Sequence, residues 1–258
     1  MPGALFSLLF PDDCRICGQP LRGISRVPVC QACLSAPKPF VAEHFCSVCG
    51  TPFANAFPLD EEGRCAICRL GMRGFDAVYC FGGYEGVLRE LVHLLKFGGV
   101  RTLARPMGRF LSAALPREER FDAIVPMPLH WRRRWQRGFN QAELLSLELA
   151  RRTGIPVRRL VHRTRPTAQQ AGLSNARRRS NVTGAFGVRR GASLKGLRIL
   201  LVDDVMTTGA TAAACSLALK RSGADRVALL TLARADRRMP GALVVPGTPA
   251  ESRPGGVI

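Results

Sequence analysis

Eight cysteines near the start of the chain constrain its fold more than any other feature. They lie within residues 14–68 of a 258-residue chain and form four Cys-x-x-Cys pairs. Twelve residues separate the first two pairs, and fifteen separate the last two. Four thiolates in two such pairs match the tetrahedral ligand set of a structural zinc ion. We predict two zinc sites with these ligands: Cys14, Cys17, Cys30, Cys33, Cys46, Cys49, Cys65 and Cys68.

The cysteine region also contains an internal repeat. Cys14-Arg-Ile-Cys17-Gly and Cys46-Ser-Val-Cys49-Gly share one pattern, in which the glycine permits the tight turn of a zinc knuckle. Disulfides would need an oxidising compartment, and a redox dithiol would not occur four times. Both sites would be closed and therefore structural. We predict a double zinc ribbon, with consecutive pairs joined in the simplest arrangement and crossed pairs as the alternative.

A second feature lies in the last quarter of the chain. Apolar residues 199–202 run directly into Asp203 and Asp204, as in a buried strand that ends at a ligand site. The hydroxyl-rich stretch that follows is expected at the start of a helix, where backbone N–H groups and the helix dipole favour a phosphate. Carboxylates for sugar hydroxyls beside a phosphate cradle suit a phosphorylated ribose. The predicted cradle comprises Val205, Met206, Thr207, Thr208, Gly209, Ala210 and Thr211.

The alternative to a ligand site is an ordinary strand-to-helix turn. Such a turn needs only one capping residue, and the two aspartates and three threonines here exceed that need.

Residues 121–130 repeat the strand-and-loop pattern, and residues 75–97 give a strand followed by an amphipathic helix that ends at Lys96. Repeated strand–helix units predict an α/β fold with a parallel sheet. The loop at Pro126, Met127 and Pro128 is a candidate to meet a pyrophosphate through backbone N–H groups, although proline has none.

The chain is strongly basic, with 38 Lys and Arg against 19 acidic residues. This excess favours a polyanionic partner, with nucleic acid first. The only two tryptophans lie in an arginine-rich block that suits base stacking and phosphate neutralisation; the alternative is a solvated basic helix start. The block comprises Trp131, Arg132, Arg133, Arg134, Trp135 and Arg137.

Residues 163–186 are polar, basic and long for a loop inside a compact domain. Arg163, Gln170, Arg177 and Asn181 are candidates to fold over a bound anion; a disordered basic loop is the equal alternative. We predict three parts: the ribbon at 1–70, an α/β domain at 71–235, and a disordered Pro/Gly/Arg-rich tail at 236–258. No apolar stretch approaches the roughly 20 residues needed to span a membrane. The start lacks a basic signal-peptide region, so we expect a cytoplasmic protein without membrane insertion.

These motifs together resemble one family. Residues 202–211 are similar to the phosphoribosyl-pyrophosphate (PRPP) signature of type I phosphoribosyltransferases. With the Cys-x-x-Cys pairs, Leu-Lys-Phe-Gly at 95–98, Pro-Met-Pro-Leu-His at 126–130 and Arg-Gly-Phe-Asn-Gln at 137–141, the chain resembles ComF-family proteins over roughly residues 5–235.

The resemblance implies a type I phosphoribosyltransferase fold in which Asp203 and Asp204 orient the ribose of PRPP and its Mg²⁺. It also implies a role in uptake of single-stranded DNA during natural transformation, beside a helicase-like partner. Two functions stay open at this point: phosphoribosyl transfer to an acceptor, and a non-catalytic nucleic-acid-binding adaptor that retains the ribose-phosphate pocket.

Overall fold

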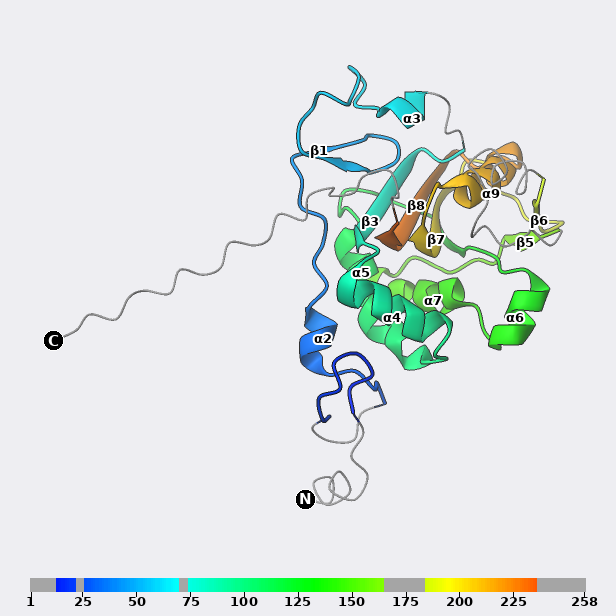
Figure 1. Ribbon diagram of the computed structural model, residues 1–258. Coiled ribbons are helices and arrows are strands. Elements are labelled where there is room, and N and C mark those ends of the chain that lie inside the picture. Colours follow the sequence, from blue (N-terminus) through cyan, green and yellow to red (C-terminus); the bar gives the residue numbers. More distant parts are fainter. Residues whose placement is uncertain (1–12, 22–25, 70–73, 165–183, 236–258) are drawn as a thin grey trace.

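A four-stranded parallel sheet forms the centre of the protein (Figure 1). The computed structural model describes residues 13–21, 26–69, 74–164 and 184–235. The strand order is β3–β8–β7–β4, and every neighbouring pair is parallel. The α/β prediction is therefore confirmed. The strands are β3 (Ala77–Gly83), β4 (Ala123–Pro126), β7 (Arg198–Met206) and β8 (Arg226–Arg234).

Helices cover both faces of this sheet because its central strands are apolar on both sides. Along β7, Leu200 and Val202 face one core, and Ile199 and Leu201 face the other. The first core is closed by α4, α5 and α7, and the second by α9. The helix bounds are α4 (Gly86–Lys96), η1 (Arg101–Leu103), α5 (Ala104–Ala114), α7 (Gln141–Thr153) and α9 (Ala210–Arg221).

A short helix and a two-stranded sheet lie outside the main sheet. Helix α6 (Trp131–Arg137) leads from β4 to α7. Strands β5 (Val161–Arg163) and β6 (Phe186–Val188) form a separate antiparallel pair.

The cysteine region forms two modules that lie apart. The first contains α2 (Gln31–Ser35), and its Cys14 and Cys33 join the core beneath α4 and α5. The second contains β1 (His44–Phe45), β2 (Pro52–Phe53) and α3 (Ala66–Arg69), and lies above β3 (Figure 1). Between them, the Phe40 N–H donates to the Phe81 carbonyl at 2.7 Å, so the linker follows the edge strand.

One expected boundary is shifted. Strand β7 continues through both aspartates to Met206, and α9 begins only at Ala210. Residues 207–209 are therefore a short connecting loop that leads into this helix. Gly209 has φ 74°, a left-handed conformation that glycine adopts without steric cost. Among the described residues, no helix combines the length and apolarity needed to cross a membrane.

Candidate ligand site and zinc centres

The two adjacent aspartates lie on opposite faces of β7 because strand side chains alternate. Asp204 follows the register of Leu200 and Val202, and its carboxylate meets Lys96 at the end of α4. Asp203 follows the register of Ile199 and Leu201 toward α9. Each carboxylate also accepts the next backbone N–H, from Asp204 at 2.9 Å and from Val205 at 2.7 Å. The pair therefore straddles the strand end.

Lys96 is the counter-ion of this pair. Its Nζ lies 3.0 Å from Asp204 Oδ1, and the two side chains are 17% and 4% exposed. An ion pair this sheltered from solvent is screened far less than a surface pair.

One carboxylate oxygen of the site can accept a further hydrogen bond or bind a metal ion. Asp204 Oδ2 is buried and has no hydrogen-bond partner among the described residues. Burial, followed by the charge of Asp204, raises the pKa of Asp203 to about 7, while Lys96 works against this rise. A buried acceptor without a donor is unfavourable. Carboxylate oxygens are the ligands that Mg²⁺ prefers, so the residues fit both a sugar hydroxyl and a magnesium ion.

The loop after β7 is the segment in which the sequence predicts a phosphate cradle. Thr208 Oγ1 accepts the Ala210 N–H at 3.4 Å, which fixes the turn into α9. The N-cap of α9 is Gly209, which has no side chain to accept a hydrogen bond from the first turn. The predicted cradle at 205–211 thus spans the end of a strand, a three-residue loop and the helix start.

The exit of β4 lies beside this loop, because β4 pairs directly with β7. It does not offer the expected backbone donors. Met127 N–H donates to the Val202 carbonyl at 2.8 Å, and its two proline neighbours have no N–H. The Met127 carbonyl accepts Asn140 Nδ2 at 3.0 Å, and Asn140 also caps α7. Pro126, Met127 and Pro128 can therefore shape the site, but backbone donation from them is not available.

The Trp/Arg block forms α6 and is largely exposed. Trp131 and Trp135 are 65% and 86% exposed, and Arg134 is exposed beside them. The Arg137 guanidinium lies 5.0 Å from the ring of Phe97, which directly follows Lys96. Phe97 is itself 67% exposed. Arg132 and Arg133 lie on the same helix, and their side chains are not described.

The remaining anion-binding candidates are only partly visible. Arg163 lies at the end of β5, with its guanidinium 5.2 Å from the Phe186 ring. Gln170, Arg177 and Asn181 fall outside the described residues. The structure therefore brings the acidic pair, the loop and the β4 exit together, and places α6 next along the chain.

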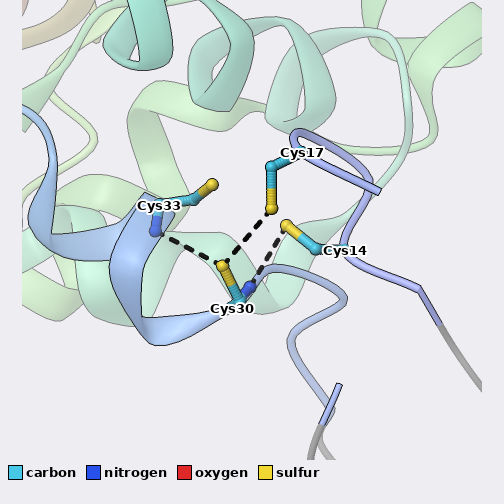
Figure 2. Close-up of side chains that lie close together, drawn as sticks. All are labelled: Cys14, Cys17, Cys30 and Cys33. Atoms are coloured by element: carbon cyan, nitrogen blue, oxygen red, sulfur yellow. Dashed lines mark hydrogen bonds between the residues drawn. The ribbon is translucent and has the colours of Figure 1, made fainter. Parts of the chain in front are cut away.

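The first zinc centre joins consecutive pairs. The sulfurs of Cys14, Cys17, Cys30 and Cys33 all lie within 4.8 Å of one another (Figure 2). Backbone N–H groups point at them, from Cys30 to Cys14 Sγ at 3.3 Å and from Cys33 to Cys30 Sγ at 3.4 Å. Although burial opposes it, such backbone hydrogen bonds lower the pKa of Cys14 to about 6. This favours the thiolate that zinc binds.

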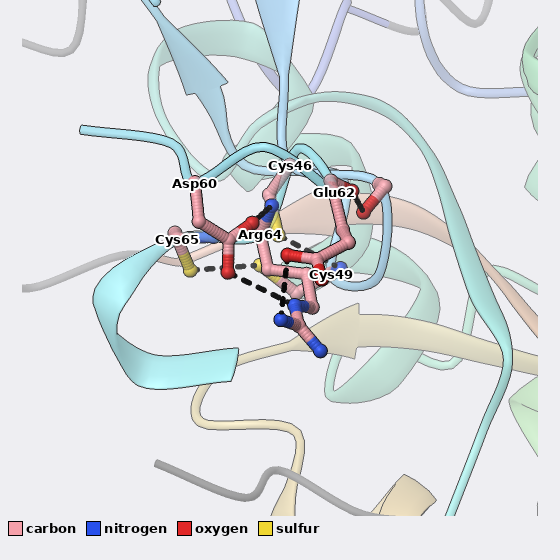
Figure 3. Close-up of polar contacts among 7 residues, drawn as sticks. Cys46, Cys49, Asp60, Glu62, Arg64 and Cys65 are labelled. Carbon is pink, nitrogen blue, oxygen red and sulfur yellow. Dashed lines mark hydrogen bonds and ion pairs between the residues drawn. The ribbon is translucent and has the colours of Figure 1, made fainter. Parts of the chain in front are cut away.

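The second centre repeats this geometry in deeper surroundings. Cys46, Cys49, Cys65 and Cys68 are all buried and again lie within 4.8 Å. Cys49 and Cys65 donate their N–H groups to Cys46 Sγ at 3.5 and 3.3 Å. Outside the centre, Arg64 bridges Asp60 and Glu62 at 3.0 and 2.7 Å (Figure 3). Both centres support the sequential pairing, and the crossed arrangement is excluded.

Sequence reasoning missed the role of Lys96, which it treated only as a helix end. One signal was available. The chain has only four lysines among its 38 basic residues, so each lysine stands out in the sequence. A compact ammonium fits between a helix end and a buried carboxylate where a planar guanidinium does not.

Fold and site define a zinc-ribbon protein with a parallel α/β domain, and comparisons with known proteins agree. Residues 5–69 match the double zinc ribbon domain family. DNA utilization protein YhgH of Salmonella typhimurium is 34% identical over 234 residues, covering 88% of this chain and 99% of that protein. Competence protein F of Haemophilus influenzae is 32% identical, covering 82% and 93%. The chain belongs to the ComF family of competence and DNA utilization proteins.

Solved structures with some likeness are phosphoribosyltransferases. A glutamine PRPP amidotransferase from B. subtilis is 21% identical with a TM-score of 0.35, covering 50% of this chain and 26% of that chain. An adenine phosphoribosyltransferase from Thermoanaerobacter pseudethanolicus is 18% identical with a TM-score of 0.31, covering 55% and 83%. At these scores the likeness carries no argument about function.

Proposed function

We propose that the strand end of β7 binds the ribose 5-phosphate group of PRPP with Mg²⁺, and that the protein supports the use of incoming single-stranded DNA. The observation that carries the proposal is the buried Asp204 carboxylate. It is paired with Lys96 at 3.0 Å on one oxygen and has no partner among the described residues on the other. A ligand hydroxyl or Mg²⁺ would satisfy that second oxygen.

In this proposal the chain's own residues mainly position the ligand. Asp203 and Asp204 accept hydrogen bonds from the ribose hydroxyls, and the 205–211 segment holds the 5′-phosphate. Mg²⁺, when bound, would neutralise the pyrophosphate and hold it in one orientation. Lys96 supplies a positive charge beside the buried Asp204 carboxylate. Transfer of a ribose phosphate through an oxocarbenium-like state needs no protein nucleophile, so positioning and charge stabilisation suffice.

The nucleic-acid part rests on α6. Exposed Trp131 and Trp135 offer rings for bases, and Arg134 offers charge for phosphates. We expect this face to bind single-stranded DNA independently of the ribose pocket. The related proteins named for competence and DNA utilization support a place in DNA uptake, which we expect in the cytoplasm beside a helicase-like partner.

The alternative is an adaptor that binds DNA and keeps the pocket without turnover. The net charge of +19 and the exposed tryptophans favour this second function. It differs from transfer in one respect: it releases no pyrophosphate. A pyrophosphate-release screen with bases as acceptors therefore distinguishes the two once PRPP binding is established.

The test compares two double variants of the full chain. Asp203→Asn with Asp204→Asn should abolish PRPP–Mg²⁺ binding in isothermal titration, while single-stranded DNA affinity stays at the wild-type value. Trp131→Ala with Trp135→Ala should do the reverse. Wild-type protein that binds no PRPP contradicts the pocket assignment. Loss of both ligands in either variant contradicts separate surfaces.

A further inference from the structure

The last residue of β8 is a buried arginine that contacts the second zinc centre. Arg234 is 4% exposed and donates from Nη1 to the Cys49 carbonyl. Its Nη2 also lies 3.8 Å from Cys49 Sγ. Four thiolates around one Zn²⁺ leave excess negative charge, and a guanidinium against one sulfur compensates it in a buried place. Groups that bond to metal ligands in this way orient them and tune the metal.

Arg234 also lies beside the candidate ligand loop. In the parallel ladder it stands opposite Met206, the last residue of β7. Directly after it, the Ala235 N–H donates to the Met206 carbonyl at 2.9 Å. Met206 is 3% exposed and is followed at once by Thr207. The Arg234 side chain therefore contacts the zinc centre, and the pairing of Arg234 with Met206 connects it to the loop at 207–209.

The zinc knuckle is seated closely on the sheet. Gly50, with φ 63°, lies so near β3 that a Cβ at this position would be 2.6 Å from the Val78 carbonyl oxygen. Cys49 Sγ is held from another side by Thr51 Oγ1 at 2.9 Å. A knuckle fixed by these contacts cannot shift without moving the Arg234 side chain.

We propose that Arg234 is a positioning residue that couples the second zinc centre to the ligand loop, so that residues 206–209 adopt the ligand-binding arrangement when this centre holds zinc. The first centre serves a different role, because Cys14 and Cys33 pack in the core beneath α4 and α5. Only the measurement with PRPP–Mg²⁺ rests on the proposed ribose-phosphate function; zinc release and hydrogen exchange of the variants need no ligand.

The main variant is Arg234→Met, which keeps the length of the side chain and removes its charge and donors. We expect one of the two zinc ions to be released to a chelating dye at least about tenfold faster than in wild type, since loss of such a partner typically costs 10–100-fold in metal affinity. Hydrogen exchange should accelerate across residues 204–211. Arg234→Lys keeps the charge without the planar fork and should give an intermediate result.

Arg226→Met is the matched control. Arg226 begins the same strand, and its guanidinium contacts Glu119 and Tyr79, where that of Arg234 contacts Cys49. Its zinc release and its exchange at 204–211 should equal those of wild type. Unchanged zinc release in Arg234→Met would overturn the proposal. Faster release with unchanged exchange at 204–211 would also overturn it, because Arg234 would then act on zinc alone.

The reciprocal measurement uses wild-type protein. Because coupling between two binding equilibria is mutual, saturating PRPP–Mg²⁺ should raise the zinc affinity of one centre, measured by equilibrium competition with a chelator, and leave that of the other unchanged. If PRPP does not bind, the proposed function fails while the chelation and exchange results still decide the role of Arg234. If PRPP binds and the zinc affinity does not rise, the coupling is wrong.

Discussion

At the scale of single residues, the site depends on one lysine and two carboxylates with different surroundings. Lys96 pairs with Asp204 at 3.0 Å, and burial together with the neighbouring carboxylate raises the pKa of Asp203 to about 7. Asp203, which lies next to the candidate ligand loop, therefore changes protonation near neutral pH.

Replacing Lys96 tests this balance. Lys96→Met should raise the pKa of Asp203 further, because it removes the one contribution from this lysine that lowers it. It also leaves Asp204 buried without its counter-ion. We expect PRPP–Mg²⁺ affinity at pH 7 to fall about tenfold or more, given about 1–3 kcal/mol for an unpaired buried group. Titration calorimetry checks this. Lys220→Met, which removes a pair with Asp76, is the control and should bind normally.

The raised pKa of Asp203 also predicts a dependence of stability on pH. Between the ordinary carboxyl value of 3.8 and about 7, the folded protein holds a proton that the unfolded chain lacks. The free energy of unfolding therefore decreases as pH rises through this window. Asp203→Asn should remove this penalty and stabilise the protein by up to about 4 kcal/mol at pH 8, with little gain near pH 4. Urea unfolding at both pH values decides; an equal gain at both would contradict the assignment.

At the scale of elements, the ligand loop depends on where β7 stops and α9 starts. The apolar run at 199–202 predicted the strand, and the hydroxyl-rich stretch predicted the turn. The sequence did not predict that β7 runs on to Met206, since pairing with β8 up to Arg234 supplies hydrogen bonds that local pattern cannot show. For the same reason the sequence did not predict that the Met127 N–H donates to the Val202 carbonyl of β7.

Gly209 tests the geometry of this loop. Gly209→Ala places a side chain at φ 74°, which costs about 1–2 kcal/mol for a non-glycine residue. We expect a small decrease in melting temperature and a clear loss of PRPP–Mg²⁺ affinity. Gly154→Ala is the matched control, because Gly154 has φ 76° at the end of α7. It should lose similar stability and keep full affinity; equal loss of affinity in both variants would count against the loop.

At the scale of the whole molecule, the cysteine pattern predicted both zinc centres and the paired motifs predicted the parallel sheet. The placement of the two modules, one under α4 and α5 and the other above β3, was not predictable (Figure 1). It depends on tertiary contacts such as Phe40 to Phe81 and Arg234 to Cys49, which join segments far apart in sequence. The pairing of Lys96 with Asp204 was not predicted because it also joins residues far apart in the sequence.

The two centres should bind zinc independently. Purified protein is expected to contain two zinc ions per chain by elemental analysis. Cys17→Ser, at the exposed ligand of the first centre, and Cys65→Ser, in the buried second centre, should each retain one. Loss of both ions from either variant would contradict two separate modules.

Hydrogen exchange of the full chain with and without PRPP–Mg²⁺ tests the central claim most directly. The ligand should slow exchange of the amides at residues 205–211, with smaller protection at the end of α4 beside Lys96. Asp203→Asn with Asp204→Asn should show no such protection at the same ligand concentration. Protection confined to other parts of the chain, or none in wild-type protein, would contradict a ribose-phosphate site at the end of β7.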